Sequence, residues 1–140
     1  MNQEHQPVTL SQERGHPVVL AFFPAAFSSV CTTELCTFRD ALGRLRNVHA
    51  QVFGISVDTF FTLKAYHTDQ KLTFPLLSDF NKDVIRAYGV FNADMIGLKG
   101  IAKRAVFVLD SKGVVRHREV LDDARNEPDY QKVYDTLATL

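Results

Sequence analysis

The chain has 140 residues, of which 46% are hydrophobic and 11 are phenylalanine, so residues 1–140 are expected to fold as one compact domain and not as a disordered chain. Sixteen basic residues balance sixteen acidic ones, which argues against nucleic-acid or anionic-membrane partners. The polar first six residues and the lack of a long apolar run predict a cytoplasmic protein without a secretory signal or a membrane span.

The first strong element is the continuous apolar run Pro17–Phe23, which is typical of a strand buried on both faces and which ends at Pro24. A helix is expected from Ser29 to Arg46, with Ser28 or Ser29 as its N-cap. Its apolar face recurs at spacings of three, four and three residues: Leu35, Phe38, Leu42 and Leu45.

The middle of the chain alternates between strands and helices. Its predicted elements, in order, are a strand at 51–57, a helix at 58–70, a strand at 74–78 and a helix at 81–88. Asp58 is expected to cap the first of these helices, and Gly89 is expected to end the second. The stretch 91–103 predicts a long loop, and loops of this length are often functional.

The C-terminal part of the chain predicts a hairpin followed by a closing helix. Its predicted elements are a strand at 105–109, a turn at 110–113, a strand at 114–120 and a helix at 128–140 with Pro128 in its first turn. The complete order is β-α-β-α-β-α-β-β-α. This order predicts an α/β fold of the thioredoxin-like type, with a central mixed β-sheet flanked by helices and a C-terminal hairpin and helix.

Cys31 comes just after the first buried strand, in the first turn of the expected helix. Unpaired N–H groups and the positive end of the helix dipole favour the thiolate there, and the thiolate is the nucleophilic form of cysteine. Cys31 shares the apolar helix face, so we expect it to face the core under Phe22, Phe23 and Phe27. A cysteine on an apolar face is by itself more often an inert core residue, so the residues around it must decide. The two cysteines and five scattered histidines show no metal-ligand spacing, and no metal or other cofactor is expected.

The segment that leads into Cys31 resembles a peroxiredoxin signature. Residues 24–31, PAAFSSVC, have the form P-x-x-x-[T/S]-x-x-C, and CTTELCTFRD at 31–40 follows as in bacterioferritin-comigratory (Q-type) and AhpE-type peroxiredoxins. FPLLSD at 74–79 and AYGV at 87–90 are similar to segments of both groups. The resemblance covers nearly the whole chain from about Pro17. It implies a thiol-dependent peroxidase that reduces hydrogen peroxide and organic hydroperoxides without a cofactor.

The resemblance also implies roles for individual residues. Cys31 would be the peroxidatic cysteine, Ser28 would hold the peroxide and hydrogen-bond the thiolate, and Pro24 would shield the pocket. Arg104 would stabilise the thiolate and the charge that develops on the peroxide oxygens. Without the resemblance, Arg104 would be interpreted as a surface arginine paired with an acid.

Two further residues of the helix, Glu34 and Arg39, are implied as supporting residues. Glu34 matches a family glutamate near the site, but it is equally well interpreted as an acid favoured in the first turns of a helix. Arg39 would support the site through salt bridges. The resemblance further implies an extra N-terminal stretch with an early hairpin, whereas only residues 7–10 precede the first strand region here.

Cys36 lies five residues after Cys31, at the spacing of the Q-type resolving cysteine. The resemblance implies that Cys36 attacks the sulfenic acid of Cys31 and that thioredoxin or a similar dithiol protein reduces the resulting disulfide. On an intact helix the two Cα atoms would be roughly 8–9 Å apart, beyond the ~7 Å limit of a disulfide, so the first turns must unwind.

Several alternatives stay open at this point. They are a one-cysteine cycle recycled by an external thiol, a peroxide-sensing redox switch protein, and a general thiol–disulfide oxidoreductase, against which the missing C-x-x-C motif argues. In the one-cysteine cycle, Cys36 is simply a half-buried helix residue. The expected partners are a peroxide substrate and a dithiol reductant, and the expected state is a monomer or weak homodimer.

Overall fold

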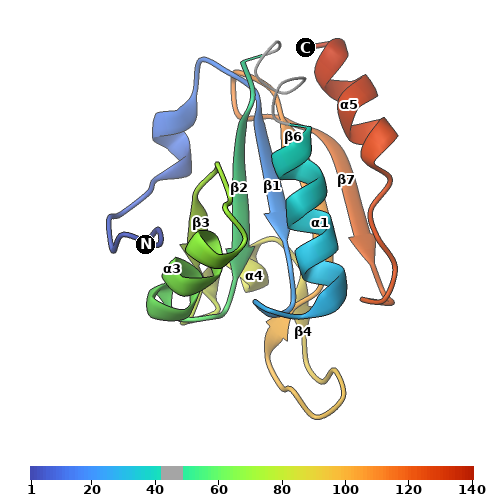
Figure 1. Cartoon of the computed structure of the whole chain (residues 1–140). Coiled ribbons are helices and arrows are strands. Elements are labelled where there is room, and N and C mark those ends of the chain that lie inside the picture. The colour runs from blue at the N-terminus through green and yellow to red at the C-terminus, as the bar shows by residue number, and fades with distance from the viewer. Residues whose placement is uncertain (42–48) are drawn as a thin grey trace.

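The computed structural model describes residues 1–41 and 49–140 (Figure 1). Its elements, in chain order, are η1 (Leu10–Glu13), β1 (Val18–Phe22), α1 (Ser29–Asp40), β2 (Gln51–Ser56), α3 (Phe60–Asp69), β3 (Leu76–Ser78), α4 (Asp83–Ala87), β4 (Phe91–Asn92), β5 (Ile101–Ala102), β6 (Arg104–Leu109), β7 (Val115–Leu121) and α5 (Tyr130–Ala138). Helix α1 begins where the sequence predicts. Residues 42–46 of the predicted helix, including Leu42 and Leu45, lie outside the described residues.

Five strands form one sheet in the order β3-β2-β1-β6-β7. Strand β1 is parallel to β2, and β2 is parallel to β3, whereas β6 is antiparallel to both β1 and β7. The sheet is therefore mixed and ends in the β6–β7 hairpin, as the element order predicts. Strand β1 and strand β6 are buried along their whole length, because both faces of the sheet are covered.

Two apolar clusters lie on opposite faces of the sheet. Helices α1, α3 and α5 cover one face, where the cluster includes Cys31, Leu35, Phe38, Leu63, Tyr66, Val133 and Leu137 (Figure 1). The other face is covered by α4, η1 and the segment that carries β4 and β5, with Leu10, Ile85, Tyr88, Phe91 and Ala102 in the cluster. Because side chains of a strand alternate between faces, successive residues of β1 belong to different clusters.

The prediction that Asp58 caps the second helix is wrong. The N-cap of α3 is Thr59, whose side chain accepts a hydrogen bond from the backbone of Thr62. The Asp58 carboxylate instead accepts hydrogen bonds from the backbone of Ala26 (2.9 Å) and from the hydroxyl of Ser56 (2.7 Å). The parallel strands β1 and β2 end at the same edge of the sheet, which brings Asp58 close to the loop after β1 and draws its side chain away from the helix.

The predicted loop 91–103 contains a small hairpin, formed by the two-residue strands β4 and β5. Strands this short carry no alternating pattern, which is why the sequence shows only a loop. The segment between them projects from the end of the molecule at which α1 begins (Figure 1). Gly89 ends α4 as predicted, with a φ of +69°. Helix α5 begins two residues after Pro128, with Asp129 as its N-cap.

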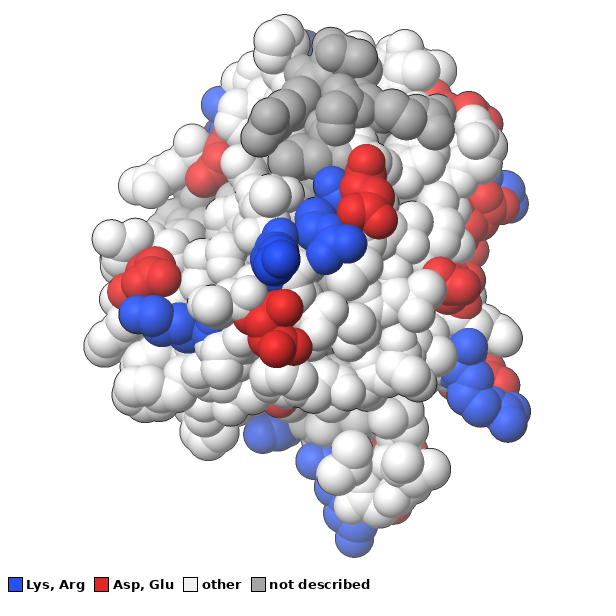
Figure 2. All heavy atoms as spheres, in the orientation of Figure 1, with Lys and Arg blue, Asp and Glu red and all other residues white. Residues whose placement is uncertain are grey.

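The N-terminal residues pair with the outer edge of β3. The backbone N–H of Ser78 donates to the carbonyl of Met1 (2.8 Å), and the backbone N–H of Leu76 donates to the side chain of Gln3 (3.0 Å). Among residues 1–41 and 49–140, no helix is long and apolar enough to cross a membrane. On the face shown in Figure 2, acidic and basic side chains lie in small mixed groups on a mostly neutral surface.

Candidate active site

Cys31 lies at the start of α1, just after the loop that connects β1 to this helix. Strand β1 ends at Phe22, a short loop follows, and α1 begins at Ser29 with Ser28 as its N-cap residue. Cys31 is therefore in the first helical turn, as predicted, and its side chain is 0% exposed. The unpaired N–H groups of this turn and the helix dipole favour a negative charge at this place.

Arg104 reaches Cys31 because of the register between β1 and β6. The two strands are antiparallel and pair Phe22 with Ala105, so Arg104, the first residue of β6, lies beside the loop that follows β1. Its side chain is only 2% exposed, and its Nη2 donates a hydrogen bond to the Sγ of Cys31 at 3.1 Å. The predicted pairing of Arg104 with the cysteine is thus present, and the surface-arginine interpretation is wrong.

Glu34, one helical turn after Cys31, contacts the same guanidinium. Its Oε2 accepts a hydrogen bond from Nη1 of Arg104 at 2.5 Å, and the carboxyl group is fully buried. Burial raises the pKa of Glu34 from an ordinary 4.5 to about 7, although Arg104 acts in the opposite direction. Of the two interpretations of Glu34, the structure therefore favours a residue beside the site over an acid favoured only by its place in the first turns of a helix.

The guanidinium of Arg104 has a third partner, which comes from the loop after β7 and not from α1. Its Nε and Nη2 both donate to the carbonyl oxygen of Ala124, at 3.2 and 3.0 Å. Burial alone would lower the pKa of Arg104, but Glu34 and Cys31 outweigh this effect and the pKa is raised. Arg104 is thus a permanent buried cation, held in one orientation by partners from α1 and from the loop after β7.

The loop before Cys31 is held in an unusual backbone conformation. Phe27 has a φ of +67°, a region that bulky residues rarely occupy. The bond from Ala26 to Asp58 fixes one side of this turn, and the hydroxyl of Ser28 donates to the carbonyl of Ala25 at 2.9 Å. In this arrangement the Ser28 hydroxyl is directed to the backbone of its own loop.

An open cleft of about 720 Å³ adjoins these residues. Pro24, which is buried, lines the cleft together with Ser28 and Arg104. The remaining lining comes from the start of α1, from the hairpin segment between β4 and β5, and from the loop after β7: Ser29, Val30, Asn92, Met95, Ile96, Asp122, Asp123, Ala124 and Arg125. The cleft leads from solvent to the guanidinium that bonds Cys31, and most of its wall near Met95 and Ile96 is apolar.

The predicted position of Cys31 under three phenylalanines is only partly correct. Phe23 shares the buried cluster of Cys31, but Phe22 points to the other face of the sheet because neighbouring strand residues alternate. Phe27 is 54% exposed and packs against the ring of Tyr66 at a centroid distance of 4.8 Å.

Cys36 and Arg39 lie on a different side of α1, and the structure does not bring them to Cys31. Both cysteines are free thiols, and the Sγ of Cys36 donates to Oε1 of Gln70 at 3.5 Å. Arg39 donates to the backbone carbonyl of the same Gln70 at 2.6 Å and pairs with the exposed Asp40. Arg39 therefore stabilises the contact between α1 and the end of α3 on the side of Cys36.

Three residues of the site were missed in the sequence: Asp58, Ala124 and Tyr66. The hydroxyl of Tyr66 shares a hydrogen bond of 2.8 Å with Thr32, the residue after Cys31. Burial raises the pKa of Tyr66 to about 12, so the phenol stays neutral. Asp58 could have been found, because it directly follows a buried parallel strand. Ala124 acts through its backbone carbonyl, which leaves no signal in the sequence.

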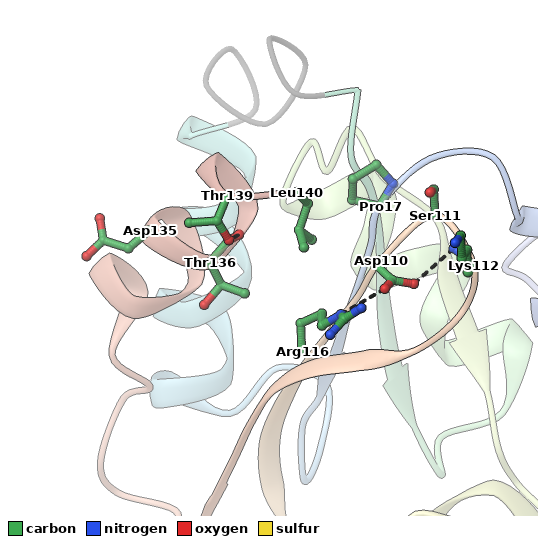
Figure 3. Close-up of a pocket in the computed structure, with 9 residues that line it drawn as sticks. All are labelled: Pro17, Asp110, Ser111, Lys112, Arg116, Asp135, Thr136, Thr139 and Leu140. Carbon is green, nitrogen blue, oxygen red and sulfur yellow. Dashed lines mark hydrogen bonds and ion pairs between the residues drawn. The ribbon is translucent and has the colours of Figure 1, made fainter.

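A second cleft, of about 880 Å³, lies at the opposite end of the sheet (Figure 3). It is lined by Pro17, before β1, and by Asp110, after β6, whereas Cys31 lies beyond the other ends of these strands. Asp110 pairs with Arg116 at 2.8 Å and accepts from the backbone of Lys112, so its charge is already satisfied. In the described part of the chain, no group of three metal-ligating side chains occurs.

A buried cysteine in the first turn of a helix, hydrogen-bonded to a buried arginine on a mixed α/β sheet, defines a thiol-based redox protein. Residues 1–118 match the AhpC/TSA family. The chain is 43% identical to alkyl hydroperoxide reductase E of Mycobacterium tuberculosis over 122 residues, which covers 85% of this chain and 77% of that protein. The chain belongs to the AhpC/TSA family and is a peroxiredoxin.

Further comparisons agree with this family. The chain is 40% identical to the chloroplastic peroxiredoxin Q of Sedum lineare over 115 residues, covering 82% of this chain and 60% of the relative. The structure of peroxidoxin BcpB from Mycobacterium tuberculosis superposes with a TM-score of 0.87 at 31% identity, over 99% of this chain and 90% of that one. This likeness confirms the predicted thioredoxin-like fold. Several curated relatives are longer, and the chain spans only 51–61% of their length.

Proposed function

We propose that this chain is a thiol-dependent peroxidase that reduces hydrogen peroxide and organic hydroperoxides with the thiolate of Cys31. The observation that carries the proposal is the 3.1 Å hydrogen bond from Arg104 to the Sγ of Cys31, in a buried helix N-terminus beside an open cleft. A buried cation and a helix dipole favour the nucleophilic thiolate. Alkyl hydroperoxide reductase E and peroxiredoxin Q, the relatives described above, support the same chemistry.

The first step is a two-electron transfer. The thiolate sulfur of Cys31 attacks one peroxide oxygen, an S–O bond forms and the O–O bond breaks. The second oxygen leaves as hydroxide or alkoxide and takes up a proton, which gives water or an alcohol. Sulfur is oxidised to a sulfenic acid while the peroxide is reduced, and no cofactor is needed.

The residues around Cys31 support this step in different ways. Arg104 stabilises the thiolate and the negative charge on the departing oxygen. Pro24 covers the sulfur from solvent, and Ser28 provides a hydroxyl that binds the peroxide after it turns from the carbonyl of Ala25. The apolar cleft wall at Met95 and Ile96 suits the organic group of a hydroperoxide.

We further propose that Cys36 resolves the sulfenic acid as an intramolecular disulfide and that thioredoxin or a similar dithiol protein reduces it. Cys36 is on a different side of α1 and bonds Gln70, so disulfide formation requires α1 to open first. Thr32, Thr33 and Thr37 are weak helix formers, which makes this opening easier. The same separation of the cysteines favours, as a second candidate, a one-cysteine cycle in which an external thiol reduces Cys31.

The setting of this activity belongs to the same proposal. Residues 1–140 would act as a single domain, as a monomer or weak homodimer, in the cytoplasm. Peroxide and the dithiol reductant would be its partners, with no nucleic acid and no membrane.

Stopped-flow peroxide reduction by the wild type and by Cys31→Ser tests the central claim. The variant is expected to lose the reaction entirely, whereas Cys36→Ser should keep the first oxidation at the wild-type rate. Undiminished reduction by Cys31→Ser would overturn the proposal. If Cys36→Ser also sustains full turnover with thioredoxin, and mass spectrometry finds no Cys31–Cys36 disulfide in the wild type, the one-cysteine cycle is correct.

A further inference from the structure

The active site holds one buried cation between two buried acids. Arg104 donates through Nη1 to Glu34 and through Nη2 to Cys31, and both acidic side chains are completely buried. If both acids were ionised, the site would carry two negative charges against one positive charge. An uncompensated charge in a buried site is strongly unfavourable, so the two acids compete for Arg104.

The hydrogen bonds of the Glu34 carboxyl group also fit a neutral form better than an ionised one. Oε1 is buried and has no hydrogen-bond partner in the described part of the chain, whereas Oε2 bonds Arg104. An ionised carboxylate requires hydrogen bonds to both oxygens when it is buried. A protonated carboxyl group carries no net charge, so burial of Glu34 costs less in this form than as a carboxylate.

The groups around Glu34 add more negative than positive charge. The charged groups that act on the Glu34 carboxyl are Arg104 of β6, Glu119 of β7 and Glu127 before α5. Glu34 in turn acts on the phenols of Tyr66 of α3 and Tyr130 of α5, and Cys31 of α1 is linked to Glu34 through their shared partner Arg104. Burial also raises the pKa of both tyrosines, which therefore stay neutral. Arg104 is the single cation in this set.

We infer that Glu34 is a positioning residue that keeps its proton while Cys31 is a thiolate, and that loss of this proton draws Arg104 away from the sulfur. With Glu34 protonated, the full charge of Arg104 serves Cys31 and the developing charge on the peroxide. With Glu34 ionised, the guanidinium is shared between two anions. The inference rests on the proposed peroxidase function, which it deepens by naming the group that limits the reaction at high pH.

The direction of the pH effect follows from the raised pKa of Glu34, about 7. Below this pH Glu34 is mostly protonated and leaves Arg104 to Cys31. Above it, Glu34 is mostly ionised, and each Cys31 thiolate reacts more slowly because Arg104 is shared. This loss of reactivity per thiolate depends on the ionisation of Glu34, so it disappears when residue 34 cannot ionise.

The substitution Glu34→Gln separates this role from a purely structural one. Glutamine keeps an oxygen that accepts the hydrogen bond of Arg104 but cannot ionise. The test measures the second-order rate constant of peroxide reduction across neutral pH and divides it by the thiolate fraction from ultraviolet absorbance. The wild-type value is expected to fall at least about fivefold as Glu34 ionises, whereas the Glu34→Gln value stays flat. Asp135→Asn, which removes an exposed carboxylate of α5, serves as the charge-matched control and should follow the wild type.

Nuclear magnetic resonance of the ¹³C-labelled Glu34 carboxyl carbon gives a second readout that needs no peroxidase activity. In the reduced wild type this carbon should titrate near neutral pH, and Cys31→Ser should move its titration to lower pH because a competing anion is lost. Titration of Glu34 in the ordinary carboxyl range, or a descending limb retained in Glu34→Gln, would overturn the inference. A wild type that consumes no peroxide but titrates Glu34 near neutral pH would contradict the proposed function alone.

Discussion

At the residue scale, the site depends on a single side chain that meets three partners at once. Arg104 donates to Cys31, Glu34 and the carbonyl of Ala124, and only 2% of it is exposed, at the inner end of the cleft. A lysine has the same charge but presents it as one point, without the planar fork that reaches partners on different sides. The geometry of the guanidinium therefore matters as much as its charge.

Arg104→Lys is expected to slow the oxidation of Cys31 by about 10²-fold, the usual effect of removing a preorganised donor from a reacting site. Stopped-flow kinetics with hydrogen peroxide measures this change. Arg116→Lys is the matched control, since Arg116 is exposed and pairs with Asp110 at the opposite end of the sheet. A rate for Arg104→Lys that equals the control would show that charge alone is sufficient.

The raised pKa of Glu34 also predicts how stability depends on pH. Because the folded state binds this proton more tightly than the unfolded state, the contribution is fully present below about pH 4.5 and is lost as pH rises through about 7. Above that pH, ionised Glu34 costs up to about 3 kcal/mol. Glu34→Gln should therefore gain stability relative to the wild type between pH 5 and pH 8 in urea unfolding. A difference between the two proteins that does not change with pH would contradict this assignment.

At the scale of elements, we expect the contact between α1 and α3 to decide whether Cys31 and Cys36 can meet. Thr32 bonds the hydroxyl of Tyr66 at one end, while Arg39 and Cys36 bond Gln70 at the other. These bonds hold α1 in the helical form in which Cys31 is sheltered. They must break before Cys36 can reach Cys31, so they oppose the disulfide that we propose.

Tyr66→Phe removes one of these bonds and leaves the ring in the core. It should lower the free energy of unfolding by about 1 kcal/mol and speed formation of the Cys31–Cys36 disulfide after peroxide addition. Mass spectrometry of alkylated, rapidly quenched samples follows the disulfide directly. Tyr88→Phe, on the other face of the sheet, is the control and should leave the rate unchanged. Equal rates in both variants would mean that opening of α1 does not involve Tyr66.

At the scale of the whole molecule, the site is assembled at one edge of the sheet from distant segments. The loop after β1, the start of α1, the start of β6 and the loop after β7 all meet at this edge. Their relative positions depend on how closely α1 packs on the sheet. Gly54 of β2 lies in the crowded layer under this helix. A Cβ there would lie 2.7 Å from Leu76 of β3 and 3.3 Å from Phe23, the residue after β1, whereas Leu35 of α1 is at an ordinary contact distance of 3.4 Å.

Gly54→Ala is therefore expected to destabilise the fold by about 1–3 kcal/mol, since the extra methyl group must displace the side chains of Leu76 and Phe23. Urea unfolding monitored by circular dichroism measures the change. The peroxide reaction should slow as well, because Phe23 begins the loop that leads from β1 to Cys31. Wild-type stability in this variant would show that the core around Leu76 adapts without strain.

The sequence by itself determined the elements whose residues carry a local pattern. Continuous apolar runs marked the buried strands, helical spacing marked α1, and the position of Cys31 after a strand marked the helix N-terminus. These features depend on neighbours along the chain, so they can be recognised without a structure. The signature around Cys31 likewise indicated the family, and the order of elements indicated the mixed α/β sheet.

Only the tertiary structure decided which distant groups meet and how deeply they are buried. The β1–β6 register brings Arg104 to Cys31. Because β1 and β2 are parallel and end at the same edge, Asp58 accepts a hydrogen bond from the backbone of Ala26 and does not cap α3. The sequence left two equal interpretations of Glu34, a site residue or an acid favoured in the first turns of a helix, whereas packing removes its carboxyl group from water and raises its pKa. Hydrogen bonds across a sheet and the loss of solvent are properties of the assembled fold, and no spacing along the chain encodes them.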